Sequence, residues 1–204
     1  MRGISYRHAA IQPKQEDHSI HLLFLERSRG RRWMRKHTYL KLLRSNFPVT
    51  INHDCNSQML NITTSSLNGL SYKEQVMLYY HSDIVLGGHG SAMTNSMFMM
   101  PHSVLIECNP PFFYEMCFAN IAWLSRVHYI SVTNYNPEYL PAKLKNAEKL
   151  YQAGSFFKKR REFAQYNIYP NALQLVSAVD DAIQFVNRWR FLYVTNQDWS
   201  RVFY

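Results

Sequence analysis

The chain has 204 residues, of which 47% are hydrophobic and 15% aromatic, so it can bury a core and is not intrinsically disordered. Its formal net charge of +9 favours an anionic partner: nucleic acid, a phosphorylated small molecule or an anionic surface. No apolar run reaches the roughly 18 residues of a membrane-spanning helix, and the first 19 residues lack the pattern of a secretory leader.

The cysteines do not indicate a metal site or a disulfide framework. Cys55, Cys108 and Cys117 form no CxxC pair and are odd in number, which leaves room for one bridge at most. The triplet Asn61-Ile62-Thr63 matches the N-glycosylation sequon, a short motif that also arises by chance.

The first predicted element is a strand at residues 20–25, IHLLFL, whose apolar run is typical of a strand buried on both faces. A basic stretch, ERSRGRRWMRK, follows it, and a helix is predicted at residues 38–45. PVTIN at residues 48–52 predicts a second strand. Residues 53–66 are polar and are expected to form a loop that carries the sequon.

The middle of the chain alternates helices and strands. Ser71 and Glu74 have the spacing of a capping box, which predicts a helix that begins there and ends before Asp83. DIVLGG then predicts a strand, followed by a glycine-rich turn and a helix at residues 92–99. SVLIEC predicts the next strand.

The last third begins with a predicted helix at residues 111–125 and a strand at residues 127–132. Residues 134–170 are the least regular part of the chain. A closing helix is predicted after them from one apolar stripe at steps of four and three residues, formed by Ala172, Val176, Val179, Ile183 and Val186.

Strands that alternate with helices favour a parallel sheet covered on both faces, an α/β Rossmann-like fold in which ligands bind beyond the carboxyl ends of the strands. We expect an irregular segment at residues 1–19, the Rossmann-like lobe at residues 20–190 and a C-terminal tail at residues 191–204.

The glycine-rich turn, Gly87 to Ser91, lies at such a strand end. Small residues let a ligand approach the backbone, and the N–H groups and dipole of the following helix suit a phosphate or diphosphate. His89 adds a donor, and Ser91 or Thr94 can cap the helix or donate. The alternative is a tight turn whose glycines only satisfy backbone geometry. The dinucleotide fingerprint is excluded because Met93 stands at its third glycine.

Two other features accompany this turn. Glu107 ends the next strand, where a carboxylate can accept hydrogen bonds from ribose hydroxyls or simply be solvated. Arginines suited to phosphate follow the first strand, among them Arg27, Arg31 and Arg32, although basic runs are commonly solvated faces.

In this order the three features resemble glycosyltransferase family 61, which includes plant xylosyl- and arabinosyltransferases and animal enzymes that add N-acetylglucosamine to glycoproteins. The resemblance covers about residues 20–133. The residues that carry its central motif are Asp83, Gly87, Gly88, His89, Gly90, Ser91, Ala92, Met93, Thr94, Asn95, Phe98, Pro101 and Glu107. The sequence departs from the commoner pattern at residues 91–93 and around Pro101.

The resemblance implies an inverting transferase of the two-lobed GT-B architecture, of which this chain is the C-terminal lobe. The implied donor is a nucleotide sugar, here expected to be UDP-linked, and the acceptor a glycan or glycoprotein. The implied ligands of the donor diphosphate are Arg27, Arg31, Arg32, Gly88, His89, Gly90, Ser91, Thr94 and Asn95, and Glu107 is the implied ligand of the ribose.

The resemblance also bears on metal binding, on the catalytic base and on the location of the protein. No metal motif of the DxD kind is present, so we expect metal-independent stabilisation of the leaving group and no cofactor. No catalytic base is assigned, and we expect it in an N-terminal lobe upstream, without which this chain can be inactive. A membrane anchor upstream and a location in the Golgi or endoplasmic reticulum lumen are further expectations.

Other classes of function remain open at this point. A nucleic-acid-binding module agrees with the net charge but leaves the glycine turn and Glu107 unexplained, and no nucleic-acid partner is expected. A non-catalytic nucleotide-binding domain would share the same turn. A hydrolase built on Ser91 fits poorly because the G-x-S-x-G spacing fails around that serine.

Overall fold

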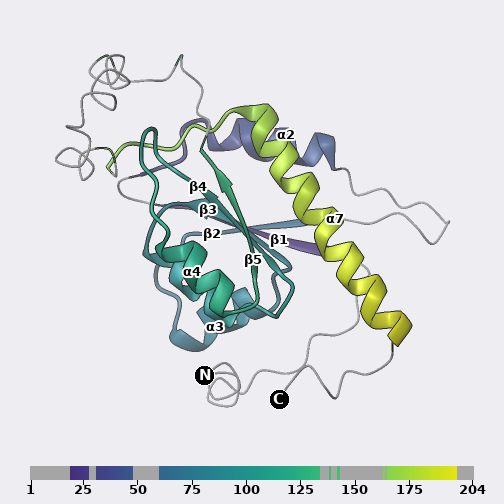
Figure 1. Ribbon diagram of the computed structural model, residues 1–204. Helices are drawn as coiled ribbons and strands as arrows, with labels where there is room; N and C mark the ends of the chain where they lie inside the picture. The colour runs from purple at the N-terminus through teal and green to yellow at the C-terminus, as the bar shows by residue number, and fades with distance from the viewer. Residues whose placement is uncertain are drawn as a thin grey trace.

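The computed structural model describes residues 19–27, 31–47, 60–133, 138, 142, 163 and 165–196, with side chains as far as residue 190. At its centre is a five-stranded sheet in the order β2-β1-β3-β4-β5, in which every pairing is parallel (Figure 1). The strands are β1 (Ile20–Leu25), β2 (Leu60–Ser65), β3 (Ile84–Gly88), β4 (Val104–Cys108) and β5 (His128–Val132).

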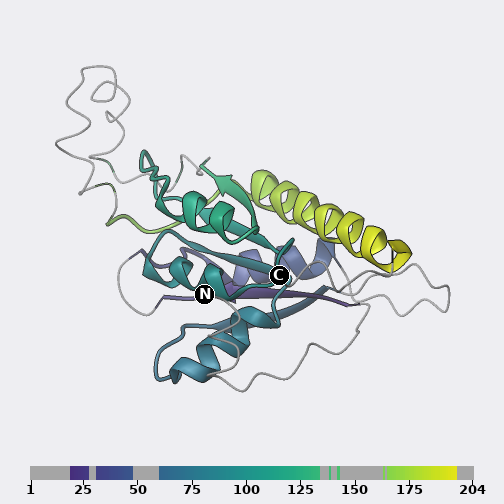
Figure 2. The ribbon, with the colours of Figure 1, turned by 60° about the horizontal axis from the view of Figure 1, so that its bottom comes forward.

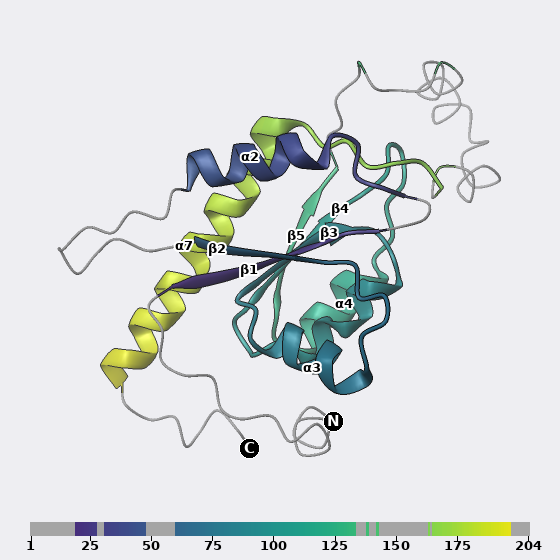
Figure 3. The same ribbon diagram turned by 180° about the vertical axis from the view of Figure 1, so that it is seen from behind.

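Helices cover both faces of this sheet, which confirms the predicted α/β Rossmann-like fold (Figures 2 and 3). One face packs against α2 (Lys36–Asn46) and α7 (Ala172–Asn196). The other packs against α3 (Tyr72–Tyr80), the 3-10 helix η1 (Ser91–Phe98) and α4 (Cys117–Leu124). Within the described residues, no helix combines the length and apolar character needed to cross a membrane.

Alternation along the central strands builds the two layers of the core. In β4, Val104 and Ile106 face α2 and α7, whereas Leu105 faces α3 and α4. All three side chains are fully buried. Burial of an aliphatic side chain contributes about 1.5 to 3 kcal/mol, so these apolar runs specify which strands are central.

The second strand lies where a loop was expected. Residues 48–52 are outside the described part of the chain, and β2 is formed by Leu60–Ser65, so the prediction of a loop at residues 60–65 was wrong. Strand β2 pairs with β1 alone and is partly exposed, so it tolerates polar residues. In it the sequon residue Asn61 donates from Nδ2 to Ser19 Oγ at 3.1 Å.

The helices agree with the predictions in kind but differ in detail. Helix α3 begins with the predicted capping box, in which Ser71 and Glu74 exchange hydrogen bonds. The predicted stripe of α7 is partly wrong, since Ala172 is exposed. The side chains that α7 buries are Leu175, Ala178, Val179, Ala182 and Val186.

Asp83, the first residue of the motif at residues 83–107, lies at the amino end of β3, away from the glycine turn. Its Oδ2 accepts a hydrogen bond from the backbone N–H of His21 at 2.9 Å and forms an ion pair with Arg190 of α7, also at 2.9 Å. Asp83 therefore connects β1, β3 and α7 and holds the fold together.

The strand order places a switch point between β1 and β3. The chain leaves β1 toward β2 at one edge of the sheet and then returns to form β3 on the other side of β1. The connections that leave β1 and β3 therefore diverge, and sheets of this order bind ligands at the carboxyl ends of the two strands. The residues at this point are those after Leu25 and those after Gly88.

Candidate functional site

The glycines of the predicted turn make room for three neighbouring side chains. A Cβ on Gly87 would overlap Met93 Cε, one on Gly88 would overlap Ile168 Cδ1, and one on Gly90 would overlap Arg27 Nη1. Gly90 has extended backbone, with φ 163°, so glycine is needed here for the space that it leaves and not for its conformational freedom. The turn therefore lets an arginine from the end of β1 lie directly on its backbone.

Two of the predicted arginines converge on this turn. Arg27 Nη1 donates to the carbonyl oxygen of His89 at 2.9 Å, and Arg31 Nη1 donates to the same oxygen at 3.1 Å. Burial, and then the charge of Arg31, lower the pKa of Arg27, but an arginine stays charged at any working pH. The carboxyl ends of β1 and β3 thus carry two adjacent positive charges.

The loop that carries these arginines is held by Trp33. Its indole N–H donates to the carbonyl oxygen of Leu25 at 2.9 Å, and its ring packs on Phe24 with centroids 4.6 Å apart. Arg31 itself has φ 47°, in the left-handed region that costs a non-glycine residue about 1 to 2 kcal/mol. Arg31 therefore combines a strained backbone with a guanidinium that donates to the carbonyl oxygen of His89.

Arg32, the third predicted arginine, is not brought to the turn by any contact in the described structure. Its side chain is exposed. Its backbone N–H donates to Asn167 Oδ1 at 3.0 Å, and its carbonyl oxygen accepts from the N–H of Ile168 at 2.9 Å. Through these backbone hydrogen bonds, Arg32 holds residues 165–170 beside the turn.

His89 forms a buried chain of hydrogen bonds with Glu107 and Tyr129. Its Nδ1 lies 2.5 Å from Glu107 Oε1, and the Tyr129 hydroxyl donates to Glu107 Oε2 at 2.6 Å. The side chain of Glu107 is 0% exposed and that of His89 is 7% exposed. Both oxygens of Glu107 are thus engaged inside the protein in this conformation, and the predicted contact with ribose stays a prediction.

The other side of the His89 ring meets two aromatic residues and a second carboxylate. Phe113 and Phe118 lie against the imidazole with centroid distances of 4.6 and 5.1 Å. Nε2 lies 4.0 Å from Glu115 Oε2, whose side chain is 44% exposed. The ring is therefore fixed in position, with Nδ1 facing the interior and Nε2 facing a partly exposed acid.

The remaining predicted ligands lie on η1. This helix is 3-10 and not α, and its first turn closes through a bond of 2.8 Å from the N–H of Met93 to the carbonyl oxygen of Gly90. Ser91 is exposed at its start and Thr94 is half-buried. Asn95 is directed to α3, where its Nδ2 donates to Gln75 Oε1 at 3.0 Å, so it joins two helices.

Tyr129 and Glu115 were not among the predicted site residues. Tyr129 pairs with Leu105 in the β4–β5 register, two positions before the partner of Glu107, so its side chain shares a face with that of Glu107. The same alternation signals that Glu107 is buried. Glu115 lies before α4, in residues 111–116, where the prediction of a helix was wrong.

The structure also bears on the cysteines and on metal binding. Cys108 and Cys117 are free thiols, and Cys55 lies outside the described residues. Burial, and then the charge of Glu107, raise the pKa of Cys108, which keeps this thiol neutral. In the ranges that the structure describes, no three His, Cys, Asp or Glu side chains cluster in a way that could hold a metal ion.

Comparison with known proteins supports one family. A stretch of 96 residues aligns, at 27% identity, with the EGF domain-specific O-linked N-acetylglucosamine transferase of Gallus gallus; it represents 46% of this chain and 17% of that protein. The chain thus matches less than one fifth of that relative's length. Residues 3–106, half of the chain, match the family described as Glycosyltransferase 61. The chain belongs to glycosyltransferase family 61.

Proposed function

We propose that this chain is the nucleotide-sugar-binding lobe of a glycosyltransferase, and that the donor's diphosphate lies between the carboxyl ends of β1 and β3. The observation that carries this proposal is the convergence of Arg27 and Arg31, which follow β1, on the carbonyl oxygen of His89, which follows β3. The convergence occurs at the topological switch point, where sheets of this order bind ligands.

The chemistry of sugar transfer explains why positive charge is needed there. As the bond to the sugar breaks, negative charge develops on the departing nucleoside diphosphate, and preorganised cations and N–H donors stabilise it. A guanidinium has five N–H donors. Arg27 and Arg31 each donate to the His89 carbonyl oxygen from Nη1 alone, and we propose that their other N–H groups bind phosphate oxygens. We propose that these two groups, with His89 and the N–H groups at the start of η1, neutralise the diphosphate without a metal ion.

The finer assignments are also proposals. The transfer is inverting, the donor is a UDP-linked sugar, and the acceptor is a glycan or glycoprotein. N-acetylglucosamine is the first donor sugar to test, because the relative in Gallus gallus is named as an N-acetylglucosamine transferase. The base that activates the acceptor belongs to an N-terminal lobe of a GT-B enzyme, and the whole enzyme acts in the lumen of the Golgi or endoplasmic reticulum.

A thermal shift experiment tests the diphosphate site. A nucleoside diphosphate at about one hundred times its Kd stabilises the folded state by about 2.7 kcal/mol, which raises Tm by about 5 to 10 °C for a chain of this size. We expect UDP to give this shift. Arg27→Ala and Arg31→Ala each remove a charge-assisted donor, so each should weaken UDP binding about tenfold or more.

Arg44→Ala is the matched control, since Arg44 is an exposed arginine in the last turn of α2. It removes the same charge and should leave the UDP shift unchanged. The proposal fails if neither UDP nor GDP stabilises the chain, or if Arg27→Ala and Arg44→Ala weaken binding equally.

A further inference from the structure

The buried carboxylate of Glu107 needs a compensating charge. A carboxylate removed from water costs several kcal/mol unless it is paired and hydrogen-bonded. Tyr129 supplies a hydrogen bond but no charge: burial, and then the charge of Glu107, raise the pKa of its hydroxyl, which therefore keeps its proton. Among the described side chains that contact Glu107, His89 is the one that can be positive.

The imidazole ring of His89 lies between two carboxylates. Each ring nitrogen faces a carboxylate, Glu107 at 2.5 Å from Nδ1 and Glu115 at 4.0 Å from Nε2. Two guanidiniums oppose this charge, and both donate to the backbone carbonyl oxygen of His89. In the described part of the chain, the charged groups within 4.0 Å of the ring nitrogens are therefore carboxylates, and Coulomb energy falls with distance.

The neighbouring thiols do not alter this balance. Burial, and then the charge of Glu107, raise the pKa of Cys108. The pKa of Cys117 is also raised, first by burial and then by the charges of Glu115 and Glu107. Both thiols therefore stay neutral near pH 7. Within the described residues, the charged groups with a contact to His89 are thus two carboxylates at the ring and two guanidiniums at the backbone carbonyl.

We propose that Glu107 and Tyr129 are positioning residues that hold His89 as an imidazolium, with its Nε2–H presented to the diphosphate. This inference rests on the proposed function for the identity of the ligand. Glu107 Oε1 accepts a hydrogen bond from Nδ1–H, the Tyr129 hydroxyl donates to Glu107 Oε2, and Phe113 and Phe118 fix the plane of the ring. A phosphate oxygen then replaces Glu115 as the partner of Nε2.

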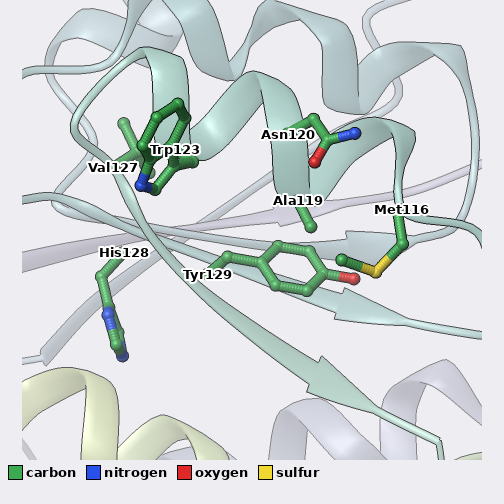
Figure 4. A pocket seen from close by; sticks show the side chains of 7 residues that line it. All are labelled: Met116, Ala119, Asn120, Trp123, Val127, His128 and Tyr129. Atoms are coloured by element: carbon green, nitrogen blue, oxygen red, sulfur yellow. The ribbon is translucent and has the colours of Figure 1, made fainter.

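The position of the Tyr129 ring allows its hydroxyl to be removed without displacing the ring. Its ring lines a pocket of about 360 Å³ between α4 and β5, together with Met116, Ala119, Asn120, Trp123, Val127 and His128. Figure 4 shows the phenol ring lying in this pocket with its hydroxyl directed toward Met116. Loss of the hydroxyl alone thus leaves a ring that can stay in place, and Tyr129→Phe tests the hydrogen bond with little change in packing.

The test measures ring protonation and nucleotide binding separately. Nitrogen-15 NMR of the histidine-labelled chain near pH 7 reports which ring nitrogens carry protons, and the His89 signals are those absent from His89→Asn. We expect both nitrogens of His89 to be protonated in the wild type. In Glu107→Gln the His89 ring should be neutral, and this variant should bind UDP about tenfold or more weakly than the wild type does.

Tyr129→Phe and Glu115→Gln separate the relay from general damage to the fold. Tyr129→Phe should weaken UDP binding several-fold without loss of the folded spectrum. Glu115→Gln should bind UDP more tightly than the wild type, because it removes a competitor for Nε2–H. A neutral His89 in the wild type, or a Glu107→Gln ring that stays charged, overturns the inference even if UDP binds. A charged His89 that responds to Glu107→Gln in a chain that does not bind UDP supports the relay and overturns the diphosphate assignment.

Discussion

At the scale of single residues, the site depends on a glycine as much as on its charged side chains. Gly90 leaves the space that the Arg27 guanidinium occupies, and the extended backbone of Gly90 is one that any residue can adopt. A methyl group there would meet the far end of a flexible side chain. The conflict therefore displaces the guanidinium and leaves the backbone as it is.

Gly90→Ala should accordingly separate binding from stability. The variant should lose about 1 kcal/mol or less of unfolding free energy, the value of one hydrogen bond, while UDP binding falls about tenfold or more. Urea unfolding and UDP titration measure the two quantities.

Gly69→Ala is the control, and it should lose stability without losing UDP binding. Gly69 has φ 78°, and a Cβ at this residue would meet nothing within 4 Å, so alanine strains the backbone by about 1 kcal/mol or more without touching the site. UDP binding should be unchanged in it. Equal binding by Gly90→Ala and the wild type would contradict the role given to this glycine.

At the scale of helices and strands, what the sequence predicts well is what is buried. The central strands β1, β3 and β4 are apolar runs that can only be interior, and Ser71 with Glu74 marks the start of α3 through local hydrogen bonds. Edge strand β2 was missed because Asn61, Thr63 and Thr64 resemble loop residues when burial is partial. Register and edge position are decided by tertiary pairing, which a single sequence does not contain.

The same reasoning explains which parts of the site were predicted. Arg27 and His89 each follow a buried strand, so their positions at the carboxyl edge were predictable, but their contact requires β1 to neighbour β3. From its place at a strand end, Glu107 was expected to bind ribose or to be solvated, whereas alternation with Leu105 directs its side chain into a buried layer. Tyr129 could be found only from the pairing of β4 with β5.

Contacts between β5 and α7 predict how stability depends on pH. His128 stacks on Phe185 of α7 with centroids 4.2 Å apart, and burial lowers the pKa of this histidine below its ordinary 6.5, with Asp181 opposing the shift. A depressed pKa in the folded state gives stability that is present above about pH 6.5 and lost as the pH falls through the folded value.

His128→Phe should therefore lose less stability than the wild type between about pH 7.5 and 5.5, because phenylalanine keeps a ring against Phe185 and removes the titration. Thermal melting across this range measures the difference in slope. His37→Gln, at an exposed position of α2, is the control and should follow the wild type. A steeper loss in His128→Phe than in the wild type would count against this contact.

At the scale of the whole molecule, a net charge of +9 attracts polyanions in general, whereas the switch point between β1 and β3 gathers two guanidiniums at one carbonyl oxygen. These are different kinds of attraction. The first is spread over the surface and is independent of geometry, and the second is local and partly buried. Salt distinguishes them, because surface charges are screened strongly and partly buried ones much less.

Binding of a polynucleotide should therefore weaken by about a thousandfold or more between about 50 and 200 mM salt if six or more phosphates are contacted, since each contact releases condensed counterions. UDP carries no such counterion atmosphere, and its affinity should change by only a few-fold over the same range. Titrations with UDP and with a double-stranded oligonucleotide at both salt concentrations make the comparison. Because the site depends on Arg27, Arg27→Ala should abolish most UDP binding while it reduces oligonucleotide binding no more than Arg44→Ala does. Equal losses of both ligands in both variants would mean that the guanidiniums after β1 act as general surface charge, and the sugar-nucleotide proposal would then lose the geometry on which it stands.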